Sequence, residues 1–218
     1  MFLSLLLAGC AAAPIQKPGS ELFPTPSAGI SIKDDMKLEK LVDEFSRVTG
    51  ITTFADSEAR QVLQKTTGLN RGVDVPAGEV YSFVESVLVQ NDLFLTVLHE
   101  REPRLFSIHS PKSQRALREA PLVVAAKDIA TFTQHPAIVV TTILDIPHVD
   151  ARTLANSMRT MLTDANTQQI IPVGNSNSLI LTGLGSTVAS WARMLQEADE
   201  SAKHNDTTQP PPKEEKPK

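Results

Sequence analysis

The stretch from Ile171 to Gly183 reads Ile-Pro-Val-Gly-Asn-Ser-Asn-Ser-Leu-Ile-Leu-Thr-Gly. Gly174 and the Asn and Ser residues after it predict a turn, because Gly and Asn tolerate the backbone angles that turns require. Pro172 has no N–H to donate to a neighbouring strand, which favours the end of a strand or an edge strand before the turn. The apolar run after the turn predicts the returning strand. This stretch therefore predicts a β-hairpin inside a folded module.

The segments around this hairpin complete a module over residues 137–199. A run rich in β-branched residues from Ala137 predicts a strand, and Asp150 is expected to cap the helix that follows. Ser186 is expected to cap the last helix. The order is strand–helix–strand–strand–helix. The apolar positions that share one face of each helix are Leu154, Met158, Met161 and Leu162 in the first, and Val188, Trp191, Ala192 and Leu195 in the second.

A first module is predicted over residues 29–110, and residues 111–136 are expected to connect the two. Asp34 or Asp35 is expected to cap a helix that ends at Gly50, and a second helix is expected over residues 78–90. Short strands are expected between and after them. The fold class is therefore α+β, with two small modules that each have a short sheet and two helices on one face. The expected buried positions are Leu38, Leu41, Val42, Phe45 and Val48, then Val80, Phe83, Val84, Val87 and Leu88.

The two ends of the chain read differently from the modules. Residues 1–9 form an apolar run that ends in Leu-Ala-Gly before Cys10, and this pattern resembles a bacterial lipoprotein signal peptide. In that family the cysteine is lipidated, and the residue after Cys10 is not acidic, which favours the outer membrane. The alternative is a buried N-terminal segment with an incidental free cysteine. Residues 10–28 are predicted to be a Pro/Ala-rich tether and residues 200–218 a disordered tail.

Composition excludes several classes of protein. The net charge of −4 and the pI of about 5.7 argue against nucleic-acid binding, which depends on clustered Lys and Arg. A single cysteine excludes an intramolecular disulfide and a cysteine-rich zinc site. No catalytic motif is found, and Asp34-Asp35 is explained by helix capping rather than by a metal. The sequence therefore predicts no enzyme, cofactor or metal. The five histidines are expected to be surface or loop residues: His99, His109, His135, His148 and His204.

The two modules resemble the periplasmic N-terminal domains of bacterial secretins, the channels of type II secretion and related machines. In the first module the resemblance is carried by Val48–Phe54 and by the helix phrase Val75–Leu88, and this module is also similar to the signalling domain of TonB-dependent transporters. In the second it is carried by Ile143–Ile146, Val149–Leu154 and, most specifically, Asn177–Gly183. The strand order of the second module is also similar to that of a KH-type unit, but it has no Gly-x-x-Gly between two helices. A secretin continues into a membrane barrel, whereas this sequence ends in the predicted tail.

The resemblance implies a non-catalytic, lipid-anchored periplasmic component of a secretin-type secretion or pilus system. Its partners would be a secretin barrel protein or other secretion components, with a possible homo-oligomer and contact with the membrane through the lipid. The alternative is a periplasmic signalling or adaptor domain that binds an envelope regulator. The residues expected to make protein contacts are Lys40, Glu44 and Arg47 on the first module, and Arg152, Asn156 and Arg159 on the second.

Overall fold

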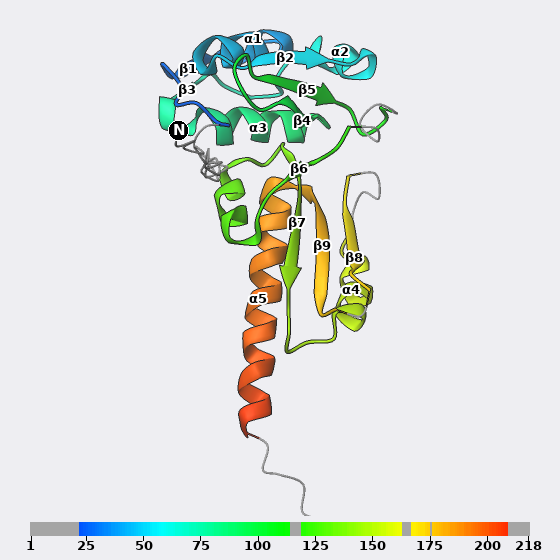
Figure 1. The fold of residues 1–218 in the computed structure, drawn as a ribbon. Coiled ribbons are helices and arrows are strands. Elements are labelled where there is room, and N and C mark those ends of the chain that lie inside the picture. The colour runs from blue at the N-terminus through cyan, green and yellow to red at the C-terminus, as the bar shows by residue number, and fades with distance from the viewer. Residues whose placement is uncertain (1–21, 114–118, 163–166, 175, 209–218) are drawn as a thin grey trace, which may run out of the picture.

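The computed structural model describes residues 22–113, 119–162, 167–174 and 176–208, and these residues form two α+β modules (Figure 1). The predicted fold class is confirmed. The elements of the first module are β1 (Ile30–Ile32), α1 (Leu38–Thr49), β2 (Thr52–Ala55), α2 (Ser57–Leu63), β3 (Val73–Val75), the 3-10 turn η1 (Ala77–Glu79), α3 (Val80–Gln90), β4 (Phe94–His99) and β5 (Leu105–His109).

The first module contains two sheets. The larger has the strand order β2-β5-β4, with β2 parallel and β4 antiparallel to β5, and the smaller pairs β1 with β3. Helices α1 and α3 pack against each other and share a core with one face of the larger sheet. The five predicted positions of α1 are all buried, because their spacing places them on one side of the helix. Strand β1 was not predicted.

The second module contains β6 (Leu122–Val123), the 3-10 helix η3 (Ala126–Gln134), β7 (Val139–Asp145), α4 (Ala151–Arg159), β8 (Gln169–Pro172), β9 (Ser178–Leu184) and α5 (Gly185–Thr208). Its sheet has the order β6-β7-β9-β8. Part of the predicted connector is thus the outer strand β6. The apolar sides of α4 and α5 both pack on the sheet face that carries Leu179 and Leu181, since Met158, Trp191 and Leu195 join the same core.

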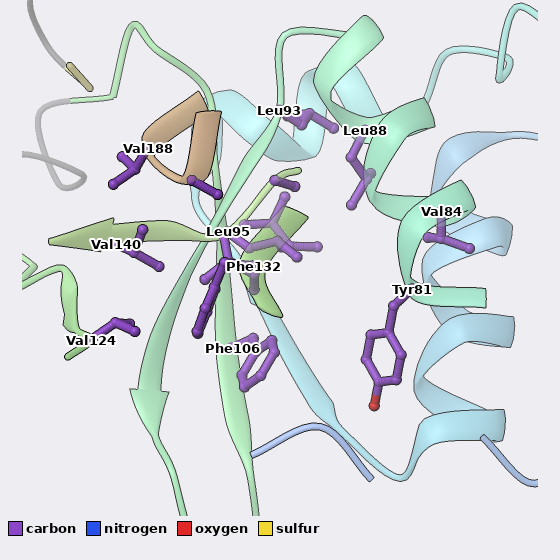
Figure 2. Close-up of a cluster of buried hydrophobic side chains, with 14 of the residues drawn as sticks. Tyr81, Val84, Leu88, Leu93, Leu95, Phe106, Val124, Phe132, Val140 and Val188 are labelled. Atoms are coloured by element: carbon purple, nitrogen blue, oxygen red, sulfur yellow. The ribbon is translucent and has the colours of Figure 1, made fainter. Parts of the chain in front are cut away.

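One hydrophobic core runs through both modules. Figure 2 shows Leu95 and Phe106 of the first module between side chains of α3 and side chains of the second module such as Val140. Modules of this size bury only about 60% of their unfolded surface when they stand alone. Sharing a core increases the apolar area that each module buries, so each module is more stable in contact with the other.

Two predictions for the N-terminal part of the chain are wrong. Helix α1 begins at Leu38 without a side-chain cap, because the backbone of the segment before β3 satisfies its first N–H: Leu38 donates to the carbonyl of Lys65 at 2.9 Å. Asp34 instead accepts from its neighbour, the N–H of Asp35. The end of the predicted tether is also packed on the fold, since Leu22 is buried and Ser27 donates to the carbonyl of Val48.

Three predictions for the second module also need correction. Helix α5 begins at Gly185, so Ser186 lies inside it and is not the cap. The helix continues to Thr208, into the predicted tail, and an i,i+3 ion pair between Glu200 and Lys203 favours this extension. Met161 is 51% exposed because α4 ends before it, at Arg159. The prediction that Asp150 caps α4 is confirmed, as its Oδ1 accepts from the N–H of Thr153 at 2.6 Å.

Gly185 allows a close approach between the start of α5 and η3. A Cβ at this position would lie 2.5 Å from the carbonyl oxygen of His135 and 3.0 Å from that of Phe132. Real Cβ atoms do not come this close to backbone oxygens, so any side chain would push α5 away from η3.

We therefore expect Gly185→Ala to lower the free energy of unfolding by about 1–3 kcal/mol, as overpacking does in a rigid site. Urea unfolding measures this change. The matched control is Gly78→Ala, because a Cβ there meets no heavy atom within 4 Å; it should change stability by no more than about 0.5 kcal/mol. Equal stability of the two variants would contradict the packing argument.

Candidate interaction surfaces and buried polar clusters

The sheet of the second module has one exposed face. On it, Ile143 of β7 pairs with Ile180 of β9, which in turn pairs with Ile171 of β8, so three isoleucines form a row across three strands. Ile143 is 54% exposed and Ile171 is 44% exposed. A contiguous apolar row on the surface is a candidate protein contact, whereas scattered apolar residues are not. We call these three residues the isoleucine row.

Polar pairs lie on both sides of the isoleucine row. Thr141 and Thr182 are hydrogen-bonded to each other at 2.7 Å, and the hydroxyl of Ser178 donates to Asp145 at 2.7 Å. Each of these polar side chains already has a hydrogen-bond partner within the sheet. A protein that covers the isoleucine row can therefore bury apolar area without leaving these polar groups unpaired. Among the described strands, β8, which carries Ile171 of the row, forms one edge of this sheet.

The sequence predicted β7 from a run rich in β-branched residues that begins at Ala137. The structure covers one face only. The other face carries Ile143, which is 54% exposed. The composition of the strand did not show which of its two faces would be open to solvent. A run of apolar residues does not reveal which of its two faces another protein covers.

The residues expected to make protein contacts lie on two helices. Glu44 accepts a hydrogen bond from Arg47 on the outer side of α1. On α4, Arg152, Asn156 and Arg159 are all exposed, and Arg159 donates to Asn156. Because α4 packs on the opposite face of the sheet, its polar side and the isoleucine row lie on opposite sides of the second module.

A groove of about 690 Å³ lies beside β3 and α3 in the first module. Leu69, Val73 and Phe83 give it an apolar lining, and Asp74 and Glu79 are the charged residues among those that line it. Phe83 was expected in the core but is only half-buried; Tyr81 and Glu85 are buried on the other side of α3 instead. An apolar lining with two acidic side chains favours a ligand that has apolar and basic groups.

His109, His135 and His148 are bound to carboxylates, which the sequence did not predict. His109 contacts Asp56, His135 contacts Glu85, and His148 contacts Asp199, at 2.8, 2.9 and 3.0 Å. The partners are 53, 50 and 51 residues apart in the chain. His109 is buried at the end of β5, so its expected surface or loop position is wrong. His135 lies in the loop between η3 and β7, as a loop residue was expected to, but its side chain is buried. No local motif could reveal these pairs, because the fold alone brings the partners together.

The His109 cluster lies on the face of the first sheet opposite α1 and α3. Nδ1 of His109 is 2.8 Å from Asp56, and Nε2 is 2.8 Å from Glu119, which also contacts the hydroxyl of Thr96. Asp56 also caps α2 by accepting from the N–H of Ala59. The imidazole is fully buried, so it cannot reach a substrate as a general acid or base must. The cluster joins β4, β5, the start of α2 and the chain after β5.

The pKa of Asp56 is lower than its ordinary value of 3.8. Burial alone would raise the pKa, but hydrogen bonds from Ser113, the Ala59 N–H and His109, together with the charge of His109, outweigh it. Asp199 follows the same pattern: burial alone would raise its pKa, but hydrogen bonds from the side chain and N–H of His148 outweigh burial and hold the pKa below its ordinary value. Both carboxylates are thus stabilised in their charged form.

The only residue predicted as a modification site, Cys10, lies outside the described residues. In the described part of the chain, no helix is both long and apolar enough to cross a membrane. The same residues contain no group of three or more His, Cys, Asp or Glu side chains placed to hold a metal ion.

Comparison with solved structures shows the fold that these features belong to. The chain is similar to a chain of the Klebsiella pneumoniae type II secretion system outer membrane complex, which contains PulD, PulS and the PulC HR domain: 19% identity, TM-score 0.58, and coverage of 77% of this chain and 26% of that one. This chain therefore spans about a quarter of that relative. The chain therefore shares its fold with part of a chain of this type II secretion complex, in agreement with the fold that the sequence resemblance predicted.

Other matches have lower structural scores. The enterotoxigenic Escherichia coli GspC-GspD complex matches at 14% identity with a TM-score of 0.29, covering 79% of this chain and 99% of that one. The N-terminal domain of the secretin XcpQ from Pseudomonas aeruginosa matches at 16% identity with a TM-score of 0.26, covering 82% and 67%. No family model and no curated protein matches the chain.

The lowered pKa of Asp56 predicts how stability depends on pH. The unfolded chain binds a proton at Asp56 more readily than the folded protein does, so the stabilisation is complete above the ordinary pKa and is lost as pH falls below about 4. We expect Asp56→Asn to cost about 1–3 kcal/mol at pH 7 and much less at pH 3, because Asn retains the cap but not the charge.

Urea unfolding of both proteins at pH 7, 5 and 3 measures this difference. Asp43→Asn, an exposed change on α1, is the control and should follow the wild type at each pH. A cost for Asp56→Asn that is the same at pH 7 and pH 3 would show that the charge of Asp56 does not stabilise the fold.

Proposed function

We propose that this protein is a non-catalytic component of a secretin-type protein secretion or pilus system, acting in the periplasm by protein–protein contact. The observation that carries the proposal is the exposed isoleucine row on a fold shared with secretin N-terminal domains. Its partners are a secretin barrel protein or another component of the apparatus, and it binds no nucleic acid. The Klebsiella relative belongs to a complex that also holds PulS and a PulC domain, which supports partners of this class.

The arrangement of surfaces also supports contact between copies of this chain. The isoleucine row and the polar side of α4 lie on opposite sides of the second module, so the sheet face of one copy can contact the helix face of the next. Two different surfaces in contact make a heterologous interface, which closes into a ring when the rotation between copies allows it. An isologous dimer would instead use the same surface on both copies.

We expect the double variant Ile143→Glu with Ile171→Glu to weaken self-association and binding to a secretin from the same genome by at least about tenfold, because burying a charge in an apolar contact is costly. Both side chains are exposed, so the fold should tolerate the change. Sedimentation of the full chain and titration with the purified secretin measure the effect.

The control for this experiment is Leu98→Glu, which changes an apolar side chain of similar exposure, 43%, on the first module. It should behave like the wild type in both assays. The proposal would be wrong if the wild-type protein stays monomeric at high concentration and binds no secretin, or if the double variant binds as the wild type does.

A lipid anchor at Cys10 is the second part of the proposal. The Leu-Ala-Gly-Cys pattern at residues 7–10 supports cleavage before Cys10 and acylation of its thiol, with the outer membrane as the destination. Each buried CH₂ of an acyl chain contributes about 0.8 kcal/mol to membrane binding, so several chains give stable anchoring.

In a bacterial host fed labelled palmitate, we expect the wild-type chain to carry the label and to sediment with the membranes. The Cys10→Ser variant should carry no label and should remain in the soluble periplasmic fraction. An unlabelled wild-type protein would remove this part of the proposal and leave the interaction role untouched.

The alternative function is a signalling or adaptor domain that binds an envelope regulator through the first module. The groove beside β3 favours it, because this surface lies entirely on the first module. Ser86→Arg places a long charged side chain in the groove. Loss of partner binding in Ser86→Arg, with binding retained when the isoleucine row is changed, would favour the adaptor function over assembly.

A further inference from the structure

The two modules meet at a contact that includes a fully buried carboxylate. Glu85 of α3 has no exposed side-chain atom. Its Oε1 contacts Nδ1 of His135 at 2.9 Å, and its Oε2 accepts from the N–H of Ala137 at 3.1 Å. Both of these partners belong to the chain between η3 and β7, so Glu85 connects the first module directly to the second.

Backbone hydrogen bonds lie next to this carboxylate. The N–H of Leu95 in β4 donates to the carbonyl of Ala137 at 2.8 Å, and Leu95 forms an isolated parallel bridge with Ile138. The N–H groups of Leu95 and Ala137 therefore both donate across the boundary between the modules. We call the contact formed by Glu85, Leu95 and residues 135–138 the module interface.

The N-terminal segment Leu22–Pro24 packs into this interface. The ring of Phe23 is stacked on His135 of the second module, with centroids 3.5 Å apart and planes 15° apart. It also meets Phe132 of the second module and Tyr81 of α3 edge to face, at 5.7 and 5.6 Å. The hydroxyl of Tyr81 donates to the carbonyl of Pro24 at 2.8 Å, which fixes the segment on the first module.

Phe23 thus touches both modules at once. On the first module it contacts Tyr81 and, at 6.3 Å, Phe106; on the second it contacts Phe132 and His135. These contacts cover the imidazole that binds Glu85. If the Phe23 ring moved away, water would reach His135. The hydrogen bond between His135 and Glu85 would then weaken, because water raises the local dielectric constant.

We propose that the Leu22–Pro24 segment holds the two modules in one fixed orientation, and that release of this segment opens the module interface while each module stays folded. The segment is therefore a conformational control element: whatever acts on the chain before Leu22 changes the position of the isoleucine row relative to the first module. The inference does not depend on the identity of a partner.

Hydrogen exchange on the full chain tests this proposal, with the amides of Leu95 and Ala137 as reporters. In Phe23→Ala we expect both to exchange at least about tenfold faster, while amides inside β5 and β9 change by less than about twofold, because local opening exposes only the bonds that it breaks. The control is Phe54→Ala, which removes a half-exposed ring on the outer side of the first module and should leave both reporters unchanged.

A second variant keeps the test decisive if Phe23→Ala does not fold. Phe23→Leu fills most of the same space but cannot stack on His135, and it should show the same pattern with a smaller change. The proposal is wrong if both reporters keep their wild-type protection in these variants, or if amides inside β5 and β9 accelerate as much as the reporters do. The second result would mean that Phe23 supports the whole core rather than the module interface.

Discussion

The structure depends on a carboxylate that has no access to water. Burial raises the pKa of Glu85, and hydrogen bonds from His135 and the N–H groups of Ala137 and Ile138 oppose that shift. A buried carboxyl group is tolerated only when its hydrogen-bonding partners are present, because leaving a buried polar group unpaired costs about 1–3 kcal/mol. Helix α3 can therefore separate from the second module only if Glu85 loses the hydrogen bonds to His135 and Ala137. This constraint explains why two modules that the sequence separates share one hydrophobic core.

The protein separates its polar groups according to the task they perform. Histidine–carboxylate pairs lie inside or between the modules and hold segments that are distant in the chain. The outer surfaces carry an apolar row on one side of the second module and charged side chains on the other. Such a molecule is suited to binding other proteins. Its histidine–carboxylate pairs stabilise the fold, and its exposed contact surfaces are already formed in the folded protein.

Local patterns predicted the parts of the fold that local contacts determine. The structure confirms three features that follow from spacing and turn chemistry: the buried apolar side of α1, the hairpin from Gln169 to Leu184 and the helix cap at Asp150. The parts that were missed depend on distant segments. Glu85 reads as one more polar residue on a helix, and Phe23 lies in a proline-rich stretch typical of a tether. Glu85 is buried, and Phe23 is partly buried, because both lie where the two modules meet. The isoleucine row was missed because composition does not show which face of a strand remains open.

The packing of Leu22 limits how far the two modules can lie from a membrane to which Cys10 is attached. Eleven residues separate it from Cys10. Even a fully extended chain of this length covers no more than about 40 Å. If Cys10 carries acyl chains, the boundary between the modules stays within that distance of the lipid headgroups, however the rest of the protein turns. Only envelope proteins with a domain in this shallow layer could then meet it.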